Sequence, residues 1–127
     1  GGDINQYLEL IKNKPDDFLI ISGDDDLALT SVINGGHGVI SVIGQAFPKT
    51  FSKMINDGLS NKISSAKSTN DNFSNIISLI FKENNPAGIK YLLHKLNLCC
   101  DVLRLPLLSV SKDLRNQINK ELINLNL

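Results

Sequence analysis

The sequence is poor in the features that mark several common classes of protein. It has two cysteines in 127 residues, Cys99 and Cys100. Adjacent cysteines rarely bridge each other, so a secreted disulfide framework is excluded and reduced thiols of a cytoplasmic protein are expected. The 13 basic and 13 acidic residues cancel, which leaves no long-range attraction for nucleic acid or an anionic membrane. The apolar runs are far too short to span a bilayer.

The start of the sequence also lacks familiar signals. It opens Gly1-Gly2-Asp3, with neither a signal peptide nor an initiator methionine, and this predicts a truncated product. What is present is 42% hydrophobic and 20% charged, as in a soluble globular protein of one ordinary domain.

The first third of the sequence predicts a helix, a strand, a helix and a strand. Ile4, Tyr7, Leu8 and Ile11 share one helical face, and Asp3 precedes them as an N-cap. The continuous apolar run 18–21 is typical of a parallel strand buried on both faces. A helix over 27–34, capped by Asp24 or Asp25 and ended by Gly35-Gly36, leads to a second buried strand over 39–43. Such short links favour parallel pairing.

The remainder of the sequence has helical periodicity. An apolar stripe from Phe47 stops at Gly58, and a longer helix is predicted over about 61–82. A third helix follows Asn85-Pro86, with Asn85 as its N-cap. After an extended linker over 103–108, Ser111 caps a last helix. Two strands do not form a sheet that stands alone, so this imbalance is a second indication of truncation.

The acidic run Asp24-Asp25-Asp26 is the first candidate for chemistry. Adjacent residues cannot all face one metal ion, so a helix cap plus one functional turn residue is favoured over a metal or acid–base cluster. In a parallel barrel the carboxyl end of a strand faces the active site. At this end Gly23 would let a substrate approach the backbone closely.

The other candidates favour structural roles. Gly35-Gly36-His37-Gly38 follows a helix and precedes a strand, which is the wrong order for a phosphate-binding loop, and His37 is therefore interpreted as a structural turn residue. His94 is expected to be a packed or surface residue. No lysine stands at a predicted strand end, where a Schiff-base amine would be buried. No metal site is predicted.

Several separated motifs together resemble dihydrodipicolinate synthase, in order and in spacing, over nearly the whole chain. Gln45 departs from the asparagine that many members have there. The motifs are Ser22-Gly23-Asp24-Asp25, Gly35-Gly36-His37-Gly38-Val39-Ile40-Ser41-Val42, Glu83-Asn84-Asn85-Pro86 followed by Lys90, and Leu103-Arg104-Leu105-Pro106.

The resemblance implies an α/β fold, the C-terminal part of a TIM barrel. Residues 1–58 would form the last two barrel strands with their helices, and residues 59–127 a C-terminal helical extension that is not an independent domain. It implies a cytoplasmic, homotetrameric lyase without a cofactor. That lyase condenses pyruvate with L-aspartate 4-semialdehyde to 4-hydroxy-tetrahydrodipicolinate, in lysine and diaminopimelate biosynthesis.

The resemblance also implies a division of the active site. Ile40 matches a pyruvate-contacting position, and Gly23 and Asp24 match the turn that lines the same pocket. Gly1-Gly2-Asp3 matches the residues that follow the Schiff-base lysine, which is therefore expected upstream of Gly1. No catalytic residue is expected within the chain, and inactivity alone is predicted. Two alternatives stay open: another pyruvate-dependent aldolase of the same superfamily, and a non-catalytic helical assembly module.

Overall fold

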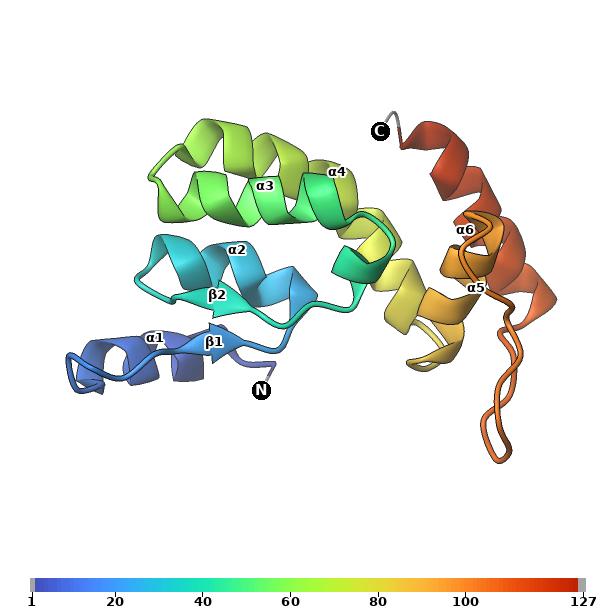
Figure 1. Cartoon of the computed structure of the whole chain (residues 1–127), viewed down its shortest axis with the longest axis horizontal. Helices are drawn as coiled ribbons and strands as arrows, with labels where there is room; N and C mark the ends of the chain where they lie inside the picture. The colour runs from blue at the N-terminus through green and yellow to red at the C-terminus, as the bar shows by residue number, and fades with distance from the viewer. Residues whose placement is uncertain (1, 126–127) are drawn as a thin grey trace. The chain divides into compact units, whose positions relative to one another are not determined.

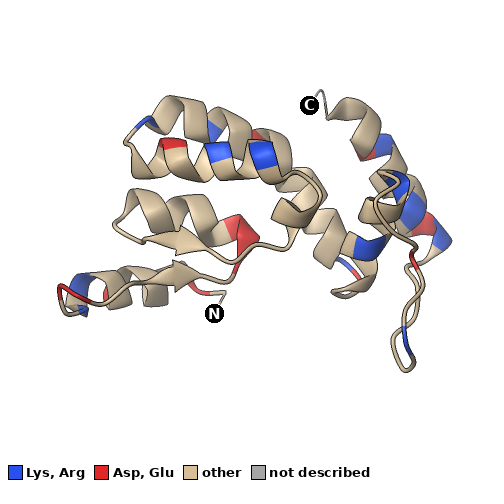
Figure 2. Ribbon diagram, viewed as in Figure 1, with Lys and Arg blue, Asp and Glu red and all other residues tan. Residues whose placement is uncertain are grey.

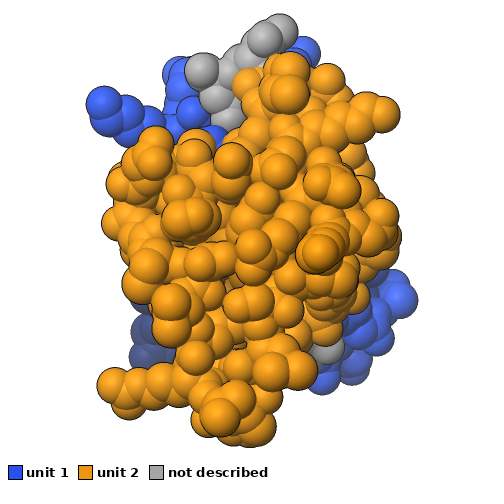
Figure 3. Space-filling model, turned by 90° about the vertical axis from the view of Figure 1, so that its right-hand side faces the viewer, with its two compact units in different colours: residues 1–71 blue, residues 72–127 orange. Residues whose placement is uncertain are grey.

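A computed structural model describes residues 2–125 of the chain. The chain divides into two compact units, Gly1–Asp71 and Asn72–Leu127 (Figures 1 and 3). The division falls inside helix α4 (Ile63–Phe81). The boundary predicted between residues 58 and 59 separates the last barrel elements from the C-terminal helical extension. It is a different division from the one between the two compact units, and it stays a prediction.

The first unit begins with the predicted order of elements. Helix α1 (Ile4–Asn13) leads to strand β1 (Ile21–Ser22), helix α2 (Asp25–Ile33) and strand β2 (Gly38–Val39) (Figure 1). A short 3₁₀ turn, η1 (Ile43–Gln45), then leads to helix α3 (Pro48–Leu59). Asp3 is the N-cap of α1, as predicted, because its carboxylate accepts a hydrogen bond from Asn5 N at 2.9 Å.

The two strands pair in parallel, as predicted, but over fewer residues than the apolar runs suggest. Ile21 lies opposite Gly38 and Ser22 opposite Val39. Beyond the pair, Ile40 N donates to Ser22 O at 2.8 Å. The second strand then ends early because the N–H groups of Val42 and Ile43 donate to the side chain of Asp25, so no further ladder forms.

Burial of the first strand on both faces was predicted, and this is wrong for the described structure. Ile20 and Ser22 are buried at 8% and 0% exposure, whereas Leu19 and Ile21 on the opposite face are 61% and 43% exposed. Helix α2 packs against both strands from one side only. Alternate side chains of a strand point to opposite faces, so the other face remains open.

Helices α2 and α3 pack closely at Gly58. A Cβ at Gly58 would lie 2.9 Å from Leu29 and 3.0 Å from Val32. The helix ends at Leu59, one residue beyond the predicted stop at Gly58, and the missing side chain of the glycine permits the close packing. Asp57 accepts hydrogen bonds from Lys53 Nζ at 2.5 Å and Ser65 Oγ at 2.8 Å, and these bonds hold the pKa of Asp57 below its ordinary value.

The second unit is helical. The later part of α4, helix α5 (Ala87–Lys95) and helix α6 (Lys112–Asn124) supply its core. The helix predicted over about 61–82 is confirmed, and its apolar stripe is buried: Phe73, Ile76, Ile77 and Ile80. Asn85 was predicted as the N-cap of the next helix, but Pro86 occupies that position, and no side chain caps the helix.

The segment between α5 and α6 forms neither helix nor strand, but the linker predicted to be extended over 103–108 is interrupted by a turn at residues 105 and 106. In this turn Leu107 N donates to Arg104 O at 3.0 Å. Ser111 caps α6 as predicted, with its hydroxyl accepting from Leu114 N at 3.1 Å. Within residues 2–125, no helix has the length and apolar character needed to cross a membrane.

Candidate functional site

The predicted substrate-binding residues lie together at the carboxyl ends of β1 and β2. Gly23 and Asp24 follow Ser22 directly, and Ile40 follows Val39, the partner of Ser22 in the sheet. The bond from Ile40 N to Ser22 O joins the two strand ends. Two residues from one strand end and one from the other therefore meet at a single edge of the sheet.

Ile40 and Gly23 present open surface at this edge. The Ile40 side chain is 77% exposed. No atom lies within 4 Å of the position that a Cβ would take at Gly23. The edge therefore offers an apolar side chain and accessible backbone side by side.

Asp24 is turned away from the helix that it was expected to cap. It occupies the N-cap position of α2 without a capping hydrogen bond. Its Oδ2 instead accepts from Gly2 N at 2.9 Å and from the Tyr7 hydroxyl at 3.1 Å. Asp24 thus ties the turn after β1 to the start of α1. Gly1, the first residue of the Gly1-Gly2-Asp3 run that resembles the family, lies outside the described residues.

Tyr7 is a site residue that the sequence did not reveal. Besides donating to Asp24, its hydroxyl oxygen accepts from Gly23 N at 3.2 Å and lies 3.3 Å from Ser22 Oγ. The ring itself is buried at 8% exposure. In the sequence, Tyr7 is one member of an apolar helical stripe, and the polar use of its hydroxyl leaves no periodic signal.

Asp25 was named as part of the acidic run and as a possible helix cap, but its contact with the segment after β2 was not predicted. Its side chain is buried at 1% exposure, and its Oδ2 accepts from Ile43 N at 2.8 Å and Val42 N at 3.1 Å. Figure 2 shows acidic residues at the start of α2, beside the end of β1. The positive end of the α2 dipole and the two N–H groups balance the carboxylate charge there.

His37 lies at the opposite, amino end of β2 and has the structural role predicted for it. Its Nδ1 accepts from Ile20 N at 3.1 Å, while its own backbone N–H donates to Ile20 O at 2.8 Å. An accepting Nδ1 places the ring proton of a neutral imidazole on Nε2. Gly36 has no room for a side chain, since a Cβ would lie 2.4 Å from Ser31 Oγ.

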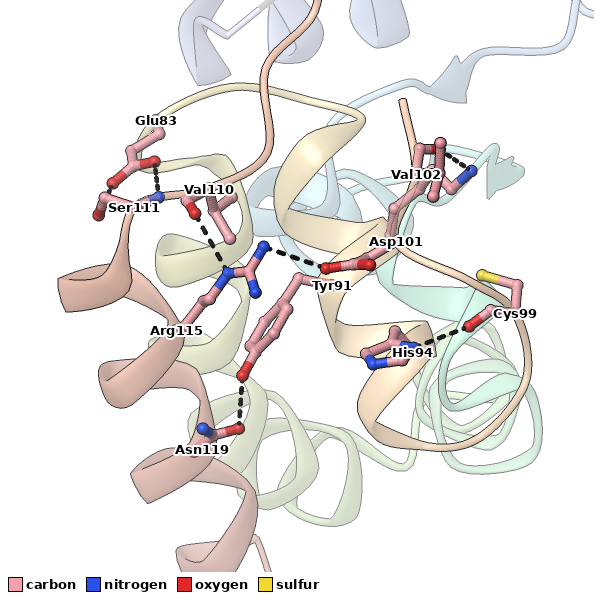
Figure 4. Close-up of polar contacts among 11 residues, drawn as sticks. Glu83, Tyr91, His94, Cys99, Asp101, Val102, Val110, Ser111, Arg115 and Asn119 are labelled. Atoms are coloured by element: carbon pink, nitrogen blue, oxygen red, sulfur yellow. Dashed lines mark hydrogen bonds and ion pairs between the residues drawn. The ribbon is translucent and has the colours of Figure 1, made fainter. Parts of the chain in front are cut away.

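The second unit holds a polar network that anchors the segment before α6 (Figure 4). Arg115 donates to Asp101 at 3.1 Å and to Val110 O at 3.3 Å, and its guanidinium lies over the Tyr91 ring, 5.0 Å from the centroid. The Tyr91 hydroxyl donates to Asn119 at 3.1 Å. His94 is exposed, with Nδ1 3.3 Å from Cys99 O. These contacts fix loop and helix and contain no nucleophile–base pair.

Neither unit contains a metal centre in its described part. Over residues 2–125, no group of three or more His, Cys, Asp or Glu side chains is arranged to hold a metal ion. No lysine stands among the residues immediately after β1 or β2, which form the site.

A parallel strand–helix–strand unit with an open edge at the carboxyl ends of its strands is typical of parallel α/β proteins, barrels among them. Comparison with known proteins agrees. The dihydrodipicolinate synthase of Aquifex aeolicus superposes with a TM-score of 0.93 at 28% identity, covering 100% of this chain and 43% of that one. The chloride-inhibited enzyme of Acinetobacter baumannii, complexed with pyruvate, has a TM-score of 0.93 at 28% identity, covering 98% and 43%.

The sequence comparisons lead to the family. The 4-hydroxy-tetrahydrodipicolinate synthase of Flavobacterium psychrophilum is 46% identical over 119 residues, which cover 94% of this chain and 41% of the relative. The model of the dihydrodipicolinate synthetase family matches residues 1–125. The chain belongs to this family, and it spans about two fifths of the length of the curated relatives it matches. It is a partial TIM barrel.

Proposed function

We propose that the chain forms the last barrel strands and C-terminal helices of a 4-hydroxy-tetrahydrodipicolinate synthase. The complete enzyme would be a cytoplasmic homotetramer that condenses pyruvate with L-aspartate 4-semialdehyde. The observation that carries the proposal is the edge at which exposed Ile40 lies beside open Gly23, in a chain whose family match runs over 1–125.

In this proposal the chain supplies one wall of the pyruvate pocket. Ile40 contacts the bound pyruvate, and Gly23 with Asp24 forms the adjoining turn. The lysine that forms the Schiff base lies upstream of Gly1, in the part of the relatives that this chain does not span. The wall then acts by orienting the Schiff base and the enamine formed from it, and correct orientation is a major source of rate.

A hybrid synthase tests the proposal. In it, this chain replaces the matching 41% of the Flavobacterium psychrophilum relative. After incubation with pyruvate and borohydride, we expect the mass of the hybrid synthase to rise by one reduced pyruvate adduct. The 127-residue chain treated in the same way should gain none. A folded hybrid synthase without an adduct would contradict the proposal.

The hybrid synthase also separates the proposed substrate from those of other pyruvate-dependent aldolases. We expect turnover with aspartate 4-semialdehyde and none with sugar-acid aldehydes. An Ile40→Ala variant should raise the KM for pyruvate, because the exposed side chain contributes apolar contact, while Ile123→Ala should not. Ile123 is 81% exposed on α6 and serves as the matched control.

A further inference from the structure

The segment 40–43 carries Ile40 and is held at both of its ends. At its start, Ile40 N donates to Ser22 O at 2.8 Å. At its end, Val42 N and Ile43 N donate to Asp25 Oδ2 at 3.1 Å and 2.8 Å. Residues from the end of β1 and the start of α2 therefore determine the path of the backbone on either side of Ile40.

The second of these anchors is unusual in its chemistry. Asp25 is 1% exposed, and its carboxylate receives backbone N–H groups from a segment 17 and 18 residues away. A buried carboxylate costs free energy unless it is hydrogen-bonded. Here the two N–H groups meet that requirement, and the same contacts fix the path of the backbone that donates them.

The neighbouring aspartates provide a comparison. The Asp24 side chain accepts hydrogen bonds from Gly2 and Tyr7, which precede it in the chain. The Asp25 side chain accepts them from Val42 and Ile43, which follow it. Asp26 is exposed on the same helix turn. The three residues have the same side chain and the same charge, but only Asp25 holds the segment that follows Ile40.

We infer that Asp25 is a positioning residue of the active site, whose buried carboxylate fixes segment 40–43 so that Ile40 faces the bound pyruvate. This inference rests on the proposed function and extends it to a residue that does not itself contact substrate. An amide at position 25 has one accepting oxygen and an NH₂ group that opposes the N–H donors. Asp25→Asn should therefore loosen the segment while preserving side-chain volume.

The test compares Asp25→Asn with Asp26→Asn in the hybrid synthase. We expect Asp25→Asn to raise the KM for pyruvate on the order of tenfold, since small misplacements of positioning groups have effects of this size or larger. Borohydride trapping at saturating pyruvate should still reach one adduct per chain. Asp26→Asn should change KM less than about twofold, as is usual for exposed sites remote from buried contacts.

The KM readout distinguishes positioning from simple stability, because partial unfolding lowers the fraction of trapped chains and leaves the KM of the folded chains unchanged. If Asp25→Asn does not fold, Asp25→Ser takes its place, because its hydroxyl is too short to reach the N–H groups and the anchor is lost. If the hybrid synthase traps pyruvate and the position-25 variant has the same KM for pyruvate as Asp26→Asn, the inference is overturned and the proposed function stands. A hybrid synthase that folds but traps nothing overturns the proposed function and this inference with it.

Discussion

Glu83 accepts both the backbone N–H and the hydroxyl of Ser111, a residue 28 positions further along the chain. Ser111 Oγ in turn accepts from Leu114 N at the start of α6. One carboxylate after α4 thus holds the N-cap of α6 in place (Figure 4). In a helical unit with a long irregular segment before its last helix, this contact determines where that helix begins.

The Glu83–Ser111 contact makes stability depend on pH. Hydrogen bonds from the Ser111 hydroxyl, and then from its N–H, lower the pKa of Glu83 below its ordinary value of 4.5. A lowered folded-state pKa stabilises the folded protein fully above 4.5, and this contribution is lost as pH falls through the folded value. We expect Glu83→Gln to lower the Tm of the hybrid synthase at pH 7, with the difference from wild type vanishing at low pH. A difference independent of pH would contradict this.

Ser111→Ala removes the cap itself and should destabilise the first turn of α6 by about 1 kcal/mol. Amide hydrogen exchange of Leu114 in the hybrid synthase measures this local opening. Ser109→Ala is the control, because Ser109 is exposed in the preceding segment and caps no helix. Equal exchange rates in the two variants would exclude a capping role for Ser111.

Tyr7→Phe isolates the hydroxyl that joins α1 to the turn after β1. The variant keeps the buried ring but removes the contacts to Gly23 N and Asp24 Oδ2. We expect a loss of about 1 kcal/mol in the free energy of unfolding and a higher KM for pyruvate. Tyr91→Phe removes the hydroxyl bonded to Asn119 in the other unit and should leave KM unchanged. An unchanged KM in Tyr7→Phe would show that this corner does not shape the site.

Alanine substitution should lower stability at Gly88 but raise the KM for pyruvate at Gly23. At Gly88 a Cβ would lie 1.9 Å from Ile80 O, so Gly88→Ala must push α5 from α4 and cost about 3 kcal/mol or more. Gly23 has open space, so Gly23→Ala should change stability by less than about 0.5 kcal/mol but raise the KM for pyruvate. Unfolding and steady-state kinetics of both variants test this; a Gly23→Ala variant with normal KM would place the substrate elsewhere.

The isolated chain should self-associate. Leu19, Ile21 and Ile40 expose one face of a two-stranded sheet, and unpaired sheet edges template association. Light scattering of the 127-residue chain should therefore show concentration-dependent aggregation, reduced by polar substitution at Leu19 and Ile21. A monomer or defined oligomer with a cooperative melt by circular dichroism would favour the assembly-module alternative.

The helices were predictable because each leaves a local pattern. The stripe from Phe73 to Ile80 and the caps at Asp3 and Ser111 involve residues within one or two turns. The strands were predicted in place but too long, because the extent of a ladder depends on partners distant in sequence. Hydropathy alone does not show that the end of β2 is diverted to Asp25.

The candidate site was predictable in part for the same reason. Gly23 was a candidate because it follows a predicted strand at the carboxyl end, whereas Ile40 was assigned to the site only through the family resemblance. In the structure the two residues follow the paired ends of β1 and β2, and their contact with substrate stays a prediction. Tyr7 was missed, and Asp25 was named only in the acidic run and as a possible cap, because their polar contacts join residues 15 to 18 positions apart. A tyrosine in an apolar stripe and an aspartate before a helix both have commoner local explanations.

The order of these contacts along the chain has a consequence for folding during translation. The hydrogen bonds around Tyr7, Asp24 and Asp25 join residues no more than 22 positions apart, and the last of them to be made is Ile43. Loops of this length cost only modest chain entropy to close, and chains fold from the N-terminus as they are synthesised. All partners of this corner are therefore present once Ile43 has emerged from the ribosome, before any residue of α5 or α6 emerges.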